Sequence, residues 1–193
     1  TYMTEDQRHL RGRGDVLTFS TPVLDEPLTV AGPITARLWV STTGEDSDWI
    51  VKIIDEHPGG DSRAASDAVG NGPGYQMLVR SETIRGRFRN DPANPQPFTP
   101  GEPALIELPL QDVLHTFQAG HRLVVQVHST WFPLIDRNPQ SWVDNIWNAA
   151  LEDFEAHTHR LHTGGERASS VELPVVRQSD LPPAWNPVAP AER

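Results

Sequence analysis

The sequence contains no cysteine among its 193 residues. Disulfide bonds, thiolate-bound metals and cysteine nucleophiles are therefore excluded within this chain. No apolar run approaches the roughly 18 residues that a membrane-spanning helix needs, so we expect no membrane partner. Residues 1–15 are polar and contain no apolar core segment, which argues against a signal peptide there.

Positive charge is scarce as well. The chain has 16 basic against 26 acidic residues, a formal charge of −10, which repels phosphate backbones and makes nucleic acid a poor candidate partner. With 37% apolar and 22% charged residues, the composition is that of a globular protein. A chain of this length favours one large domain that can bury a sizeable core without a metal or a disulfide, and we expect no cofactor.

Three motifs of catalytic and phosphate-binding sites do not occur. The serine-nucleophile pentapeptide G-x-S-x-G is missing, and so are the phosphate-binding patterns G-x-x-x-x-G-K and G-x-G-x-x-G. These absences argue against the sites that the three motifs form, but they do not exclude other kinds of catalytic site.

Short strands dominate what is present. The 18 prolines and 14 glycines disfavour long helices. Residues 34–41, 104–110 and 122–128 alternate apolar and polar side chains, and residues 49–54 are apolar on nearly both faces, as in a central strand. Weaker strand candidates are residues 16–20, 28–31, 77–88, 157–163 and 170–176. Roughly nine strands with Gly/Pro turns, such as Ala31-Gly32-Pro33, predict an all-β sandwich or barrel.

The remaining segments are irregular. Residues 144–156 place Ile146, Ala150 and Phe154 four apart, which predicts one or two short helices. Residues 56–75 are rich in glycine and predict a long exposed loop, and residues 90–101 predict an extended surface segment. After Val176 the pattern stops. We therefore expect a folded unit over residues 1–177 and a proline-rich tail over residues 178–193.

Two groups of residues could bind a metal, but neither is a complete site. His157 and His159 share a face if their segment is a strand, yet no nearby carboxylate completes a ligand set. Asp46 and Asp48 could offer oxygens to calcium, or they could bond backbone amides in a β-turn. We expect no metal site, and the question of a structural calcium near Asp46 and Asp48 stays open.

Aromatic residues cluster in the last third of the chain. Trp131, Phe132, Trp142, Trp147 and Phe154 fall between residues 131 and 154. An exposed aromatic patch of this kind marks a ligand groove or a protein interface. The alternative is core packing beneath a long connection. Trp131, Phe132, Trp142 and Trp147 are our interface candidates.

The chain resembles the C-terminal domain that X-Pro dipeptidyl-peptidases share with bacterial cocaine esterase and the α-amino-acid ester hydrolases. The resemblance covers residues 2–177. It begins with DQRHLRGRGDVLTFSTPVL (6–24) and continues, in family order, through residues 30–60, 85–90, 99–140 and 169–176. GYQMLVRSETIRGRFR (74–89) and HSTWFPLIDRNPQSWVDNIW (128–147) are most similar to the α-amino-acid ester hydrolase and glutaryl-acylase branch.

This resemblance implies a jelly-roll β-sandwich of the galactose-binding-like type that follows an α/β-hydrolase domain. The Ser-His-Asp triad of the family lies upstream of the segment that begins at Asp6, so no catalytic residue is transferred to this chain. The expected role is a non-catalytic module of a bacterial serine acyl-hydrolase that packs on the hydrolase domain and shapes the entrance to its active site. Tyr2 is the only residue that we expect near the substrate.

Other functions and partners remain open at this point. A free-standing carbohydrate-binding jelly roll is the alternative, in which Trp131, Trp142 and Trp147 would stack on sugar rings. The partners implied by the resemblance are the hydrolase domain of the same protein and the small acyl substrate of that domain, and family members also form homo-oligomers. The sequence does not indicate a cellular compartment.

Overall fold

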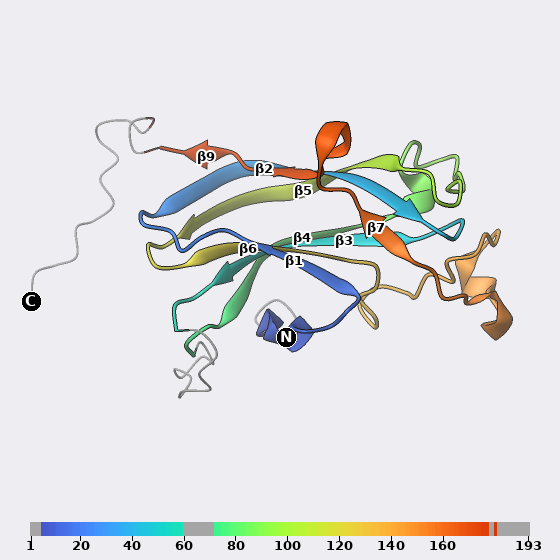
Figure 1. The fold of residues 1–193 in the computed structure, drawn as a ribbon, viewed down its shortest axis with the longest axis horizontal. Helices are drawn as coiled ribbons and strands as arrows, with labels where there is room; N and C mark the ends of the chain where they lie inside the picture. Colours follow the sequence, from blue (N-terminus) through green and yellow to red (C-terminus); the bar gives the residue numbers. More distant parts are fainter. Residues whose placement is uncertain (1–4, 60–71, 178–179, 181–193) are drawn as a thin grey trace, which may run out of the picture.

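A computed structural model describes residues 5–59, 72–177 and 180. Its strands form two antiparallel sheets that lie face to face, as Figure 1 shows. Sheet A has the order β1-β6-β3-β4, with strands Val16–Ser20 (β1), Arg122–His128 (β6), Asp48–Glu56 (β3) and Gln76–Arg85 (β4). The predicted all-β sandwich is confirmed.

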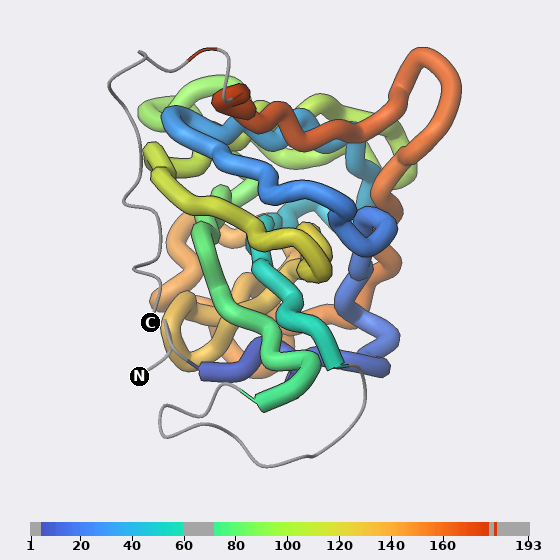
Figure 2. Tube along the Cα trace, turned by 90° about the vertical axis from the view of Figure 1, so that its left-hand side faces the viewer, coloured from blue at the N-terminus to red at the C-terminus, as the bar shows by residue number. Residues whose placement is uncertain are grey.

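Sheet B is built around the long strand β2 (Leu28–Thr42). Strand β5 (Ala104–Phe117) pairs along one side of β2. Three short strands pair along its other side, β7 (His159–Leu161), β8 (Ser170–Glu172) and β9 (Val175–Val176). In the view of Figure 2, sheet B is the upper layer and sheet A lies beneath it.

The core lies between the two sheets and follows the predicted alternation. On β2, the side chains of Ile34, Ala36, Leu38 and Val40 are buried in it, while Arg37 faces outward and pairs with Glu107 on β5. Sheet A contributes Trp49, Val51, Ile53, Leu123 and Val127 to the same core. Burying these apolar side chains between two layers is the main stabilising contribution to a fold of this type.

Strand β3 is buried on both faces, as the apolar run 49–54 predicted. Its odd-numbered residues from Trp49 to Ile53 face sheet B. Its opposite face is covered by the first 3-10 helix, η1 (Gln7–Leu10), and by Trp131. We call this side of sheet A, which faces away from sheet B, the outer face of sheet A. Figures 1 and 2 show the N-terminal segment beneath it.

The predicted turn at Ala31-Gly32-Pro33 is wrong. The predicted strands 28–31 and 34–41 are one continuous strand, and the pairing of β2 with β5 shifts register between Gly32 and Ile34. Pro33 has no N–H to donate to the ladder, and a β-bulge accommodates it. Gly32 has φ of +126°, a backbone conformation that other residues rarely adopt.

The irregular segments are only partly as predicted. Two short helices lie within 144–156, as single 3-10 turns η3 (Ile146–Asn148) and η4 (Leu151–Asp153), and two more are η2 (Gly86–Phe88) and η5 (Gly165–Arg167). Segment 90–101 has no regular structure, but it does not only run over the surface, because Phe98 is buried in the core.

Gly86 makes room for this Phe98 anchor. A Cβ atom at Gly86 would lie 2.5 Å from the Phe98 ring and 2.5 Å from the Ser47 carbonyl oxygen. Most of the predicted loop 56–75, residues 60–71, lies outside the described residues, and so does the predicted tail 178–193 apart from Asp180. Among the residues that the structure does describe, no helix is long and apolar enough to cross a membrane.

Two leucines on β5 test the inner and outer faces of sheet B. Leu110 is 2% exposed and Leu114 is 80% exposed. Leu110→Ala leaves a cavity in the core and should lower the free energy of unfolding by about 2–5 kcal/mol. Leu114→Ala, the matched control, should change it by less than about 0.5 kcal/mol. Urea denaturation measures both values, and equal losses would contradict the assignment of the core to the space between the sheets.

Candidate functional site

Lys52 is the only lysine in the sequence, and it lies on the outer face of sheet A with 0% of its surface exposed. Its Nζ donates a hydrogen bond to Gln7 Oε1 (2.8 Å) and lies 3.8 Å from the centre of the Trp131 ring. Gln7 is held in turn, because its Nε2 donates to the Glu5 carbonyl oxygen (2.8 Å). A buried cation thus joins β3 to η1 and to the segment that follows β6.

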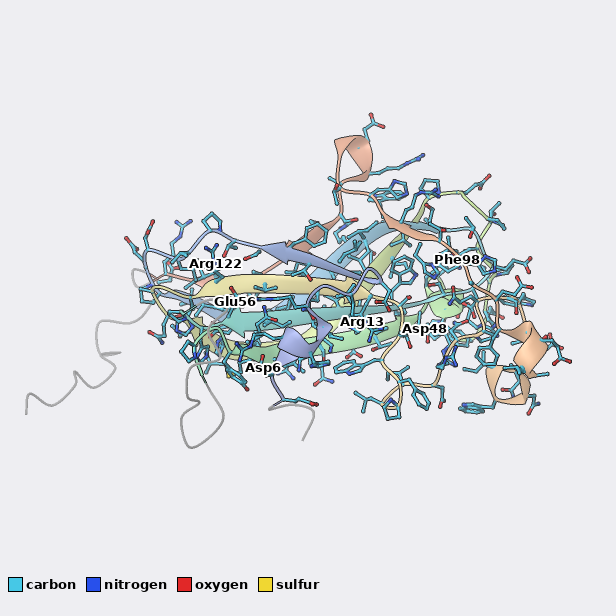
Figure 3. All side chains as sticks on the ribbon, turned by 60° about the horizontal axis from the view of Figure 1, so that its bottom comes forward. Asp6, Arg13, Asp48, Glu56, Phe98 and Arg122 are labelled. Carbon is cyan, nitrogen blue, oxygen red and sulfur yellow. The ribbon has the colours of Figure 1, made fainter. Side chains whose placement is uncertain are left out.

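Asp6 fixes η1 in this position. Its carboxylate accepts hydrogen bonds from the Arg8 amide (3.0 Å), the Arg8 Nε (2.7 Å) and the amide of Gln76 on β4 (3.2 Å). Partial burial opposes the charged form, but these hydrogen bonds outweigh it and lower the pKa of Asp6. Asp6 is therefore both the N-cap of η1 and its link to the edge of sheet A (Figure 3).

Burial also lowers the pKa values of two basic groups on the outer face of sheet A, Lys52 and His128. It lowers the pKa of Lys52 to about 8, with the charge of Glu5 acting in the opposite direction. It lowers the pKa of His128, on the neighbouring strand β6, to about 4. His128 is consequently neutral near pH 7, with its Nδ1 donating to the Thr130 carbonyl oxygen (2.8 Å). Its buried Nε2 can accept a hydrogen bond and has no partner among the described residues.

A depression of about 690 Å³ opens beside this buried network. His128, Trp131, Phe132 and Leu134 form its apolar and aromatic side, and the other lining residues are Glu5, His9, Leu10, Arg13, Thr130, Pro133 and Arg137. Phe132 is 66% exposed and Leu134 is 45% exposed. We call this surface the Trp131 depression. Large exposed apolar side chains around a concave, partly charged surface are typical of a contact site for another protein surface.

The four aromatic interface candidates do not lie together in the structure. Trp131 and Phe132 both line the Trp131 depression. Trp142 packs against Arg87, whose guanidinium carbon lies 4.4 Å from the centre of the Trp142 ring. Trp147 is exposed, and its Nε1 donates to Asp136 Oδ2 (2.8 Å). The three tryptophans considered for sugar stacking therefore have three different surroundings.

Trp142 does not line the Trp131 depression, and it contacts Arg87 instead. Arg87 Nε donates to Asp46 Oδ2 (2.7 Å) in a fully buried ion pair, and Arg87 Nη1 donates to the Val143 carbonyl oxygen (2.8 Å). Trp142 therefore packs on the arginine of this buried pair. Tyr2, the predicted substrate-proximal residue, lies outside the described residues.

The residues considered for metal binding have other partners. Asp46 Oδ1 accepts from the Ser47 amide (2.9 Å), and Asp48 Oδ1 accepts from Asn138 (2.8 Å) and lies 3.4 Å from Arg85 Nε. Burial raises the pKa of Asp48 to about 6. The turn therefore bonds arginines and amides, as the β-turn interpretation anticipated in part.

His157 and His159 both line one depression, but they have different hydrogen-bond partners. His157 lies against Thr43 (3.1 Å) and Glu155 (3.1 Å), whereas His159 Nε2 lies 2.9 Å from Gln140 Oε1. Lys52 and His128 were not predicted as members of a site. A single lysine within an otherwise apolar strand is the one signal that could have identified Lys52.

The pKa of Lys52 predicts a specific pH dependence of stability. Between pH 8 and 10.5 the unfolded chain keeps the Lys52 proton and the folded chain loses it. The unfolded state then binds more protons, so the free energy of unfolding should rise with pH across this window. In Lys52→Met this rise should be absent. Urea denaturation at several pH values measures it, and the two tyrosines, present in both proteins, cancel in the comparison. Identical slopes would contradict the lowered pKa.

Comparison with known proteins identifies a family to which most of the chain is similar. Residues 4–172 match the family described as the X-Pro dipeptidyl-peptidase C-terminal non-catalytic domain. Cocaine esterase from Rhodococcus sp. (strain MB1 Bresler) is 33% identical over 173 residues, which cover 90% of this chain and 28% of that protein.

Two solved structures have the same fold over nearly the whole chain. An α-amino acid ester hydrolase superposes with a TM-score of 0.84 at 43% identity, and an aminopeptidase from a marine sediment Thaumarchaeota archaeon superposes with a TM-score of 0.84 at 41% identity. Each alignment covers 91% of this chain and 28% of the other chain. The chain thus spans little more than a quarter of the length of these relatives.

Proposed function

Because this chain belongs to the family of X-Pro dipeptidyl-peptidase C-terminal non-catalytic domains, we propose that it is the C-terminal module of a larger serine acyl-hydrolase. The match of residues 4–172 to that family is the observation that carries the proposal. The names of the relatives, an esterase, an ester hydrolase and an aminopeptidase, support hydrolysis of an ester, amide or peptide bond by the whole protein.

In this proposal the Trp131 depression packs on the catalytic domain. Phe132 and Leu134 provide exposed apolar surface for this contact. Glu5 lines the same depression, so a domain that precedes residue 1 would join the chain close to this surface. Interfaces between domains of one chain bury about 600–1,500 Å² and combine apolar and polar contacts of this kind.

In this proposal the module influences the reaction only by where it lies relative to the active site of the catalytic domain. By covering the catalytic domain beside its cleft, it would narrow the entrance to the active site and exclude water from part of it. Tyr2 precedes the depression in sequence and remains our candidate for a residue near the acyl substrate. The exposed Trp147, which Asp136 ties to the segment of Arg137, would extend the contact surface.

The first test asks whether the chain alone has activity. The isolated 193-residue polypeptide should show no hydrolysis of p-nitrophenyl acetate or of an amino-acid ester above the buffer rate, because the sequence lacks G-x-S-x-G. The catalytic domain, assayed in parallel, is the positive control. Turnover by the isolated chain that a serine-directed inhibitor abolishes would overturn the non-catalytic assignment.

The second test locates the packing surface with two exposed leucines, Leu134 in the segment after β6 and Leu114 on β5. Leu134→Ser should weaken association of the chain with its cognate catalytic domain about tenfold, since it removes apolar area from the contact. Leu114→Ser is the matched control, because Leu114 is exposed on the opposite layer of the sandwich. Titration calorimetry measures the binding constants of both variants. A larger loss of affinity for Leu114→Ser would place the contact on sheet B.

A further inference from the structure

A polar cluster lies at the end of the sandwich where β3 ends and β6 begins. Asp55 continues the row of odd-numbered β3 side chains that faces sheet B, and His57 follows directly after the end of β3. In Figure 3 this end is marked by Glu56 and Arg122, which are labelled there. The cluster therefore lies far from the Phe98 and Asp48 end of the same sandwich.

Two further histidines reach this end from β5 and from the turn that follows it. His115 lies on β5 between the buried residues Val113 and Phe117 in the alternating pattern, so its side chain faces sheet A. His121 lies in the turn between β5 and β6. Both layers of the sandwich thus contribute to the cluster.

The four side chains meet around the Asp55 carboxylate. Asp55 Oδ1 lies 2.7 Å from His121 Nδ1, and Asp55 Oδ2 lies 2.9 Å from His115 Nε2. The rings of His57 and His121 have centres 4.6 Å apart. One ligand atom each from Asp55, His57 and His121 lies within 4.8 Å of the others. Among the described residues this is the one group of three or more such side chains that comes this close together.

The arrangement of these groups suits a metal ion. The Asp55 side chain is nearly fully buried, and each of its two oxygens lies within hydrogen-bond distance of an imidazole nitrogen, from His115 or from His121. Imidazole nitrogens with one carboxylate oxygen are a donor set that suits Zn²⁺, whereas Ca²⁺ and Mg²⁺ prefer oxygen ligands alone.

We propose that Asp55, His57 and His121 form a zinc site at this end of the sandwich. The ion would bind Asp55 Oδ1 and His121 Nδ1 in place of the hydrogen bond between them, and the neutral His121 ring would carry its proton on Nε2 instead. His115 does not bind the ion but holds the second carboxylate oxygen, as an outer partner does in many zinc sites. Three protein ligands leave the fourth position to water.

The site has a structural consequence that does not depend on the proposed function. It connects the end of β3 in sheet A with the turn that leads from β5 into β6, and through His115 with sheet B. Zinc would therefore clamp the two layers together at the end opposite to Asp48 and raise the melting temperature.

The test is a titration of the metal-free 193-residue chain with Zn²⁺, followed by calorimetry, and with Co²⁺, followed by visible absorption. We expect one saturable equivalent of either ion, and an absorption spectrum of Co²⁺ with nitrogen and oxygen ligands in a four-coordinate site. His57→Gln and His121→Gln should each weaken zinc binding about 100-fold, and His115→Gln about tenfold.

The control is His157→Gln, which removes a histidine of the other cluster considered above and should leave the zinc affinity unchanged. The melting temperature of each variant without metal shows whether it is folded. The wild-type Co²⁺ spectrum also tests the proposal independently of any variant. Absence of saturable binding by the wild-type chain, or loss of binding in His157→Gln but not in His57→Gln, would overturn the proposal.

Discussion

The burial of β3 on both faces is the constraint on which the rest of the structure depends. Sheet B covers one face with an ordinary apolar core. The other face needs a separate cover, and η1 together with Trp131 provides it, with Lys52 enclosed between them. A buried ammonium group is costly unless it is paired, and the Gln7 oxygen and the Trp131 ring compensate it without a second full charge. The N-terminal segment is thereby fixed to sheet A.

The same cover produces the candidate contact surface. Because η1 and the segment after β6 meet only partly, a depression remains between them, with Phe132 and Leu134 on its rim. A second protein surface at this position would bury the exposed side chains of Phe132 and Leu134. The proposed module role rests on the burial of this apolar surface against the catalytic domain.

The sequence predicted the fold better than the site. Strict alternation over residues 34–41 and the apolar run 49–54 identified the strands correctly, because burial on one or both faces leaves a direct periodic signal. The bulge at Gly32 and Pro33 was mistaken for a turn, because Gly-Pro serves both purposes. The cluster of Asp55, His57, His115 and His121 was missed because strand pairing, which sequence periodicity does not specify, brings residues 55 and 121 together.

The most direct test of the contact surface is amide hydrogen exchange, measured on the isolated chain and on the same chain bound to its catalytic domain. Residues 129–137 should exchange more slowly in the complex, while residues 113–117 on the opposite layer should exchange at the same rate in both states. Unchanged exchange at 129–137, together with slower exchange at 113–117, would contradict the assignment of the outer face of sheet A as the contact surface.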